Sequence, residues 1–541
     1  MKNKKNFSRW ATLIFYPVIG LAGVFALNYS MAIQPWGGSD TAVYFNMAQN
    51  IAAGHGFVTN YPSGNLSFVG LHPPFFSIVL SLFVKYQISL ITAVKILNSI
   101  FFAMILIITG LWIQGKTHSW VCGFLVSFTL LFQPAFLQTF TAAMSEPLYL
   151  FLAIASLILL IEGLLRSNGS VGWLVVSAVL AGLASFTRFI GVSSILLGCV
   201  AILLFLSVRP VKKWLLALLY GIVAGAPLLF WFLQKSLIFP TNTSRTIVFP
   251  ADFYHACARF FYGVVDTVIA WMPPAMLMED TRLRRWVTLA IVVLLLVVWL
   301  WLNHQHYRKL FHQHDPRILL VLVMLLLVVF YLVVFFVSYV FSSIPPDIYA
   351  RTLIMLIPCL VIALFSVLQI SFYGFGQKKS FFTLAVFLIF TVGFLPAYSV
   401  QSITFMKDQH QIEDGYLQPK YVHSELLQVI HQLPAQSLIS NQAAVVLLYT
   451  GKYPYEFREF ECEKVKGRSD IPFGAGTSQD DQRYRSGMLL VVFQDDINRI
   501  FYNCFSNNAS EYIQTFFSYS RAIATTSDGY VYQYDPKGEE K

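Results

Sequence analysis

The chain has 541 residues, of which 57% are hydrophobic and only 12% are charged. This composition excludes an ordinary soluble protein, because soluble domains carry about 25% charged residues. The net charge of +10 follows from basic residues scattered between apolar runs and does not indicate nucleic-acid binding. The composition therefore predicts a polytopic membrane protein.

Charge divides the chain into two parts. Residues 1–402 carry 24 Lys and Arg against 9 Asp and Glu, which leaves 13 of the 37 basic and 18 of the 27 acidic residues for residues 403–541. We expect a transmembrane domain over residues 1–402 and a small soluble α/β domain over residues 403–541. Helical periodicity in "SELLQVIHQLP" and short apolar runs such as "GMLLVVF" and "GYVYQY" favour the α/β interpretation.

A transmembrane helix needs about 20 mostly apolar residues. The basic amino end "MKNKKNFSRW" leads into the first candidate, and the stretch 73–86 is too short to span, so it is either half-inserted or joined to the next helix. The pattern predicts about eleven spans, near residues 10–33, 92–113, 120–140, 146–166, 171–187, 189–208, 213–234, 286–303, 318–342, 352–372 and 381–400.

Basic residues concentrate in alternate loops, which predicts a cytoplasmic N-terminus. The segments 34–91, 235–285 and 403–541 then lie outside, with "TRLRRW" at 281–286 as the exception. A hidden span over residues 251–275 would invert the second half, but three charged residues interrupt that stretch and disfavour it. We expect a bacterial cytoplasmic membrane.

Asp40 begins the stretch "SDTAVYFNMAQNIA" in the first outer loop. One interpretation is a helix N-cap, a role that Asp commonly fills; the other is a functional carboxylate. Asn46, Gln49 and Asn50 would lie on one side of the helix, and the other side would hold Val43, Tyr44, Met47, Ala48 and Ile51. This pattern predicts an interfacial helix lying along the membrane surface.

Further polar groups occur at the outer ends of predicted spans. Because charge at membrane depth is costly, such groups pair with each other or face a polar cavity. Arg188 and Glu146 could form a structural ion pair, and Arg351 could extend its side chain to the interface. Convergence of several groups on one face favours a site; its candidate members are His72, Glu146, Arg188, Asp347 and Arg351.

The order of these motifs is similar to that of the GT-C superfamily of membrane glycosyltransferases. The similarity covers about residues 10–400, through "SDTAVYFNMAQNIAAGHGF", "HPPFF", "MSEPLYLFLAIASL", "SFTRFIGV" and "IYARTLIMLIPCLVIAL". It implies a polyprenyl-phosphate sugar donor, an extracytoplasmic acceptor and Asp40 at the reaction centre. By the same resemblance Arg188 and Arg351 contact the donor phosphate, and the candidate pocket residues are Tyr44, His72, Glu146 and Asp347.

One difference concerns the acid. Relatives commonly carry a second acidic residue beside the first, whereas Ser39 and Thr41 flank Asp40 here. A single carboxylate holds a divalent metal poorly, so we predict no metal or other cofactor and an inverting displacement at the anomeric carbon. The alternatives are a transporter or flippase of lipid-linked sugars, and a polysaccharide ligase or polymerase.

Overall fold

The computed structural model describes residues 2–60, 66–166, 170–238, 247–272, 286, 290, 315–343, 345–374, 387–411, 415–433, 438–456, 488–493, 510 and 520–534. By packing, the chain forms two compact units. The helical unit comprises Met1–Pro35, Gly70–Phe76 and Ile91–Ile412; the mixed unit comprises Trp36–Val69, Ser77–Leu90 and Glu413–Lys541. Residues 36–69 and 77–90 thus pack with the C-terminal residues.

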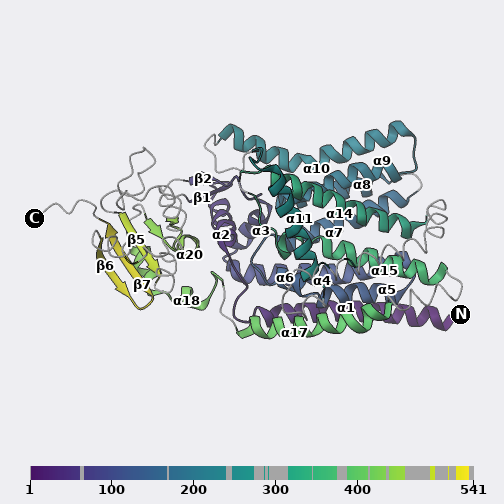
Figure 1. Ribbon diagram of the computed structural model, residues 1–541, viewed down its shortest axis with the longest axis horizontal. Helices are drawn as coiled ribbons and strands as arrows, with labels where there is room; N and C mark the ends of the chain where they lie inside the picture. Colours follow the sequence, from purple (N-terminus) through teal and green to yellow (C-terminus); the bar gives the residue numbers. More distant parts are fainter. Residues whose placement is uncertain are drawn as a thin grey trace, which may run out of the picture. The chain divides into compact units, whose positions relative to one another are not determined.

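Long helices lie side by side in the helical unit (Figure 1). Its elements are α1 (Lys2–Ser30), α4 (Leu90–Thr117), α5 (Trp120–Phe132), α6 (Pro134–Phe140), α7 (Glu146–Leu165), α8 (Val171–Thr187), η1 (Phe189–Gly191), α9 (Val192–Phe205), α10 (Pro210–Ile238), α11 (Phe253–Ala270), α14 (Pro316–Val340), η2 (Ala350–Leu353), α15 (Leu356–Gly374), the π-helical η3 (Ile389–Phe394) and α17 (Leu395–Gln411). The boundary predicted at residues 402 and 403 lies inside α17.

Within the described residues, four helices are long and apolar enough to cross a membrane, or five if the bent pair α5 and α6 is one span. The four are Leu90–Thr117, Glu146–Leu165, Pro210–Gln234 and Pro316–Val340. The predicted number of about eleven stays a prediction, and the stretch 286–303 falls almost wholly outside the described residues. The segment 73–86 forms a separate helix, α3 (Phe75–Lys85).

The bend between α5 and α6 follows from the sequence "QP". The two helices meet at 65°. Pro134 has no N–H to donate and disfavours helical geometry at the residue before it, so Gln133 is extended, with φ −78° and ψ 115°. Its side chain then accepts a hydrogen bond of 2.6 Å from the Phe136 N–H, which caps the second helix.

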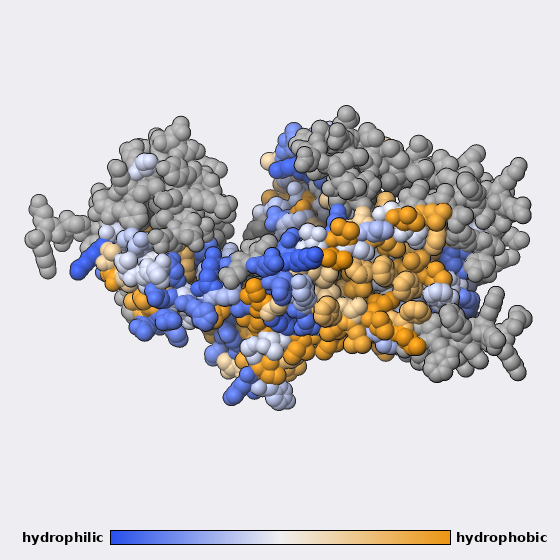
Figure 2. All heavy atoms as spheres, turned by 90° about the horizontal axis from the view of Figure 1, so that it is seen from below, coloured by the Kyte–Doolittle hydropathy of each residue, from blue (hydrophilic) through white to orange (hydrophobic). Residues whose placement is uncertain are grey.

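Apolar side chains point outward along the helical unit. Figure 2 shows hydrophobic residues gathered over its helices on the face in view. Leu21 and Phe25 of α1 are 67% and 72% exposed, and Trp214 of α10 is 66% exposed. Soluble proteins rarely expose apolar patches of this extent, so this surface is typical of a multi-pass membrane protein.

A mixed five-stranded sheet forms the core of the mixed unit. Its strand order is β4 (Tyr455–Glu456), β3 (Leu438–Ser440), β5 (Met488–Phe493), β7 (Gly529–Tyr534) and β6 (Ser520–Thr526). β3 runs parallel to both neighbours, and β7 runs antiparallel to both of its own. The helices are α18 (Pro419–Val422), α19 (Glu425–Gln432) and α20 (Ala443–Thr450), of which α19 and α20 bury Leu426, Ile430 and Val446 in the core. The predicted helix in "SELLQVIHQLP" and strands in "GMLLVVF" and "GYVYQY" are therefore confirmed.

The mixed unit also contains α2 (Ser39–Ala52) and a hairpin of β1 (Val58–Asn60) and β2 (Leu66–Phe68). Of the three residues predicted on the polar side of α2, Gln49 is exposed, but Asn46 and Asn50 are buried. Asn46 and Asn50 are only 4% and 8% exposed, because Asn46 Oδ1 accepts hydrogen bonds from Asn50 Nδ2 at 3.1 Å, Thr59 Oγ1 at 2.9 Å and the Asn60 N–H at 2.9 Å. The hairpin thus provides hydrogen-bond partners for these side chains in place of water. Helix α2 also packs against α20.

We expect the Asn46→Ala variant to be less stable than the wild type. The substitution removes the acceptor of the part-buried donors of Thr59 and Asn60 and one of the acceptors of the buried Asn50 amide, at a cost of about 1–3 kcal/mol for an unsatisfied group. Thermal unfolding of the purified protein in detergent measures the effect. Gln49→Ala is the matched control, since Gln49 lies on the same helix and is exposed; equal midpoints for the two variants would contradict this role of Asn46.

Candidate functional site

Glu146 is the first residue of α7, directly after the N-cap residue Ser145. Asn98 of α4 holds the preceding turn, since its side-chain amide donates to the carbonyls of Phe140 at 2.9 Å and Ala142 at 2.8 Å. The N-terminus of a helix carries partial positive charge, so this position favours a carboxylate. Glu146 is 1% exposed and therefore needs cationic partners.

Arg188 lies at the break between α8 and η1. Its backbone is extended, with φ −147° and ψ 135°, and its N–H donates to the Ala184 carbonyl at 2.9 Å. Gly191 lets the chain turn back closely on α8, because a Cβ there would be 2.5 Å from the Ser185 nitrogen. This tight turn directs Arg188 toward the start of α7.

Arg351 lies in the 3-10 helix η2. Tyr331 of α14 donates a hydrogen bond of 2.5 Å to the Thr352 carbonyl, which fastens η2 to a membrane helix. Arg351 Nη2 donates to the Tyr349 hydroxyl at 2.6 Å, and Arg351 Cζ lies 5.0 Å from the centre of the Tyr349 ring. These contacts fix the direction of the guanidinium group.

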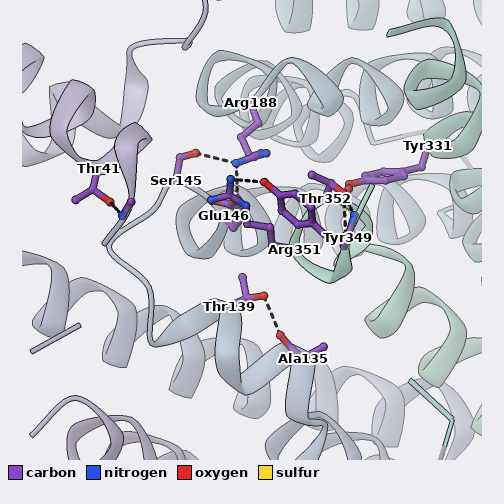
Figure 3. Close-up of polar contacts among 11 residues, drawn as sticks. Thr41, Ala135, Thr139, Ser145, Glu146, Arg188, Tyr331, Tyr349, Arg351 and Thr352 are labelled. Atoms are coloured by element: carbon purple, nitrogen blue, oxygen red, sulfur yellow. Dashed lines mark hydrogen bonds and ion pairs between the residues drawn. The ribbon is translucent and has the colours of Figure 1, made fainter. Parts of the chain in front are cut away.

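The two arginines converge on the one glutamate (Figure 3). Arg188 Nη1 lies 2.7 Å from Glu146 Oε1, and Arg351 Nε lies 3.9 Å from the same oxygen. Arg188 Nη1 also donates to Ser145 Oγ at 3.2 Å. The predicted ion pair of Arg188 and Glu146 is therefore confirmed, and Arg351 belongs to the same cluster.

Two guanidinium groups approach one carboxylate in this cluster, and the arginine side chains are only 23% and 27% exposed. A charge that is largely removed from water is stabilised by a counter-ion. Guanidinium groups fit phosphate and carboxylate oxygens with two parallel donors, so the arrangement is suited to binding an anion.

Asp40 and Tyr44 lie on α2 in the mixed unit. Asp40 is not the N-cap: Gly38 occupies that position, and Asp40 is the second residue of the helix. The Thr41 hydroxyl accepts a hydrogen bond of 3.0 Å from the Gly38 N–H, which takes over part of the capping. Tyr44 is 2% exposed, and its carbonyl accepts a bond of 3.0 Å from Ser77 Oγ.

The remaining candidates, His72 and Asp347, lie in loops. His72 is half-buried before α3, and Asp347 is exposed before η2. The structure therefore brings together three of the seven predicted site residues, namely Glu146, Arg188 and Arg351.

Sequence reasoning missed three residues that support the cluster, namely Asn98, Tyr331 and Tyr349. Asn98 could have been found as a polar residue inside an apolar span, which membrane helices rarely tolerate without a role. Tyr349 stands two residues before Arg351 in "IYAR". Nothing in the pattern distinguishes Tyr331 from the many aromatic residues of its helix.

Over the described parts of the chain, no group of three His, Cys, Asp or Glu side chains is placed to hold a metal ion. The predicted metal independence of the reaction stays a prediction. Activity measured in the presence of a chelator would test it.

Comparison with known proteins shows which solved structures have a similar fold. No protein-family model and no curated protein sequence matches the chain. Among solved structures, it is similar to ArnT from Cupriavidus metallidurans in the apo state, with a TM-score of 0.53 and 13% identity over 95% of this chain and 97% of that one. The same protein bound to undecaprenyl phosphate gives a TM-score of 0.51 and 11% identity, with the same coverage.

A third similar structure is the apo oligosaccharyltransferase from Archaeoglobus fulgidus. Its TM-score is 0.51, with 10% identity over 98% of this chain and 75% of that one. These proteins are members of the GT-C superfamily, so the predicted GT-C-like fold is confirmed over nearly the whole chain.

We expect Glu146→Gln to destabilise the helical unit, because it leaves two guanidinium groups without their buried counter-charge. Removal of one partner from a buried ion pair typically costs about 3–5 kcal/mol, which thermal unfolding in detergent measures. The double variant Glu146→Gln/Arg188→Gln removes one charge of each sign and should recover part of the loss. A double variant less stable than the sum of both single variants would contradict this charge balance.

Proposed function

We propose that the protein is a membrane glycosyltransferase that moves a hexosyl or pentosyl group from a polyprenyl-phosphate carrier to an extracytoplasmic acceptor. The acceptor is a glycan, a lipid or a protein. The N-terminus lies in the cytoplasm and the C-terminal domain outside a bacterial cytoplasmic membrane. The single observation that carries the proposal is the convergence of the Arg188 and Arg351 guanidinium groups on the buried carboxylate of Glu146.

The donor phosphate binds at the two guanidinium groups. Glu146 holds Arg188 in place through the 2.7 Å ion pair, and a guanidinium group, with five N–H donors, can bind two phosphate oxygens at once. The structure of ArnT in complex with undecaprenyl phosphate supports a lipid phosphate as the ligand of this fold, with a TM-score of 0.51. The same donors stabilise the negative charge that grows on the phosphate as the sugar leaves.

Asp40 acts as the general base. An acceptor hydroxyl or amine attacks the anomeric carbon while the Asp40 carboxylate removes its proton. The bond between the anomeric carbon and the phosphate oxygen breaks, and the bonding electrons leave with the polyprenyl phosphate. A single displacement of this kind inverts the anomeric configuration. We assign Tyr44, His72 and Asp347 to binding of the sugar or the acceptor.

A transporter of lipid-linked sugars would need polar sites near the middle of the membrane. The cluster instead lies at the start of α7 and in the 3-10 helix that precedes α15, which supports chemistry at a helix end. A ligase or polymerase would take a diphosphate-linked oligosaccharide. Whether the protein accepts a monophosphate or a diphosphate donor therefore distinguishes the glycosyltransferase from this alternative.

We expect Asp40→Asn to retain donor binding while losing most turnover, because loss of a general base typically lowers the rate by about 10²–10⁴-fold. Steady-state kinetics with a polyprenyl-phosphate sugar measure kcat and the donor KM. Asp252→Asn is the matched control, since Asp252 caps α11 through the His255 N–H at 3.0 Å and Asn can serve the same role. Normal turnover in the Asp40 variant would remove this residue from the mechanism.

We expect Arg188→Ala and Arg351→Ala to raise the donor KM and also to lower kcat, since these residues bind the phosphate and stabilise its developing charge. Donor binding by fluorescence or calorimetry checks the first effect directly. Arg166→Ala is the control: Arg166 lies at the other end of α7, with its Cζ 4.7 Å from the Trp173 ring. An equal loss of donor affinity in all three variants would contradict a phosphate site at the cluster.

Purified protein in detergent should consume a polyprenyl-phosphate sugar and release the free polyprenyl phosphate. Detergent removes the two separate compartments that transport requires but leaves transfer chemistry intact. The reaction should continue in the presence of a chelator. Thin-layer or mass analysis of the lipid product measures both points; an unchanged donor contradicts the glycosyltransferase, and restoration by one added metal contradicts metal independence.

A further inference from the structure

The turn that leads into Asp40 is bound by the C-terminal residues of the mixed unit. The Tyr416 N–H donates a hydrogen bond of 2.9 Å to the Gly37 carbonyl, three residues before Asp40. Gly415 has φ +85°, and a Cβ there would be 2.7 Å from Gly37 O and 3.0 Å from Gly37 N. Backbone therefore meets backbone at this point, in a conformation that only glycine adopts easily.

Side chains complete the contact. Leu417 is 1% exposed, and a Cβ added to Gly37 would lie 2.8 Å from its Cγ. Tyr449 of α20 donates to the Tyr416 carbonyl at 3.2 Å. Burial raises the pKa of Tyr449 to about 12, so this hydroxyl keeps its proton at neutral pH. The segment that holds Gly37 is thus fixed to a core helix of the C-terminal domain.

The far side of α2 is held as well. Asn46 and Asn50 bond to the hairpin after the helix, and Asn60 of that hairpin donates to the Gly451 carbonyl at the end of α20. Helix α2 itself packs against α20. The C-terminal domain therefore contacts the first outer loop before, along and after the helix that carries Asp40.

We infer that Gly415, Tyr416 and Leu417 are positioning residues for Asp40. They set the place of the turn at Gly37, and through it the start of α2 where the proposed base stands. This inference rests on the proposed function of Asp40 and assigns a role in that reaction to the C-terminal domain. A base must lie within hydrogen-bond reach of the proton it removes, and a displacement of about 1 Å can cost about 10²-fold in rate.

The test uses the full-length protein and a rescue. Gly37→Ala places a methyl group against Leu417 and should lower kcat by about 10- to 100-fold without changing the donor KM. Leu417→Ala, added to Gly37→Ala, makes room for that methyl group and should restore most of kcat. Gly415→Ala should act like Gly37→Ala, whereas the control Gly54→Ala has a similar φ of +86° but nothing within 4 Å of its new Cβ and should keep normal kcat.

Hydrogen exchange of the amides of residues 38–41 gives a readout that does not depend on catalysis. Exchange should become faster in Gly37→Ala and Gly415→Ala, return in the Gly37→Ala/Leu417→Ala protein and stay unchanged in Gly54→Ala. The inference is overturned if exchange does not respond, if Leu417→Ala gives no rescue or if Gly54→Ala behaves like Gly415→Ala. If exchange follows the expected pattern but Asp40→Asn turns over normally, the contact is supported and Asp40 is refuted as the base. A failure of the inference can thus be told apart from a failure of the proposed function.

Discussion

The arrangement of the helical unit depends on one buried carboxylate. Glu146 is almost fully removed from water, and a lone carboxylate in such surroundings would be very costly. Arg188 at 2.7 Å and Arg351 at 3.9 Å from its Oε1 oxygen offset that cost. Three distant segments must meet for this purpose: the start of α7, the break after α8 and the 3-10 helix before α15. The ion cluster is thus a packing constraint as well as a candidate binding site.

The supporting contacts follow from the same constraint. Each charged residue lies where regular helical structure stops, because a side chain can leave the lipid-facing surface most easily there. Asn98 and Tyr331 hold these irregular segments by donating to backbone carbonyls, and the hydroxyls of Ser145 and Tyr349 accept hydrogen bonds from the guanidinium groups. Such bonds are valuable in a membrane protein, where little water reaches the backbone. These contacts hold the two guanidinium groups in a fixed direction.

Sequence alone predicted much of this architecture. Long apolar runs located α4, α7, α10 and α14, and the cost of charge in lipid identified the ion pair of Glu146 with Arg188. The position of α2 was not predictable, because its amphipathic pattern suits a membrane surface and a protein interior equally well. Only the hairpin after α2 reveals that Asn46 and Asn50 have protein partners. The grouping of residues 36–69 with the C-terminal domain likewise depends on contacts such as Tyr416 with Gly37, which join residues that are far apart in the chain.

The discontinuous mixed unit has a consequence for protein engineering. In the sequence, the C-terminal residues resemble a separate domain added after the helices. The residues that they pack against, however, lie near the start of the chain, at 36–69 and 77–90. In a chimera that exchanges the tail alone, the foreign residues at positions 415 and 417 would have to fit against Gly37 of this chain. The exchangeable piece is instead the tail together with residues 36–69 and 77–90, so grafts and truncations should be cut at those borders.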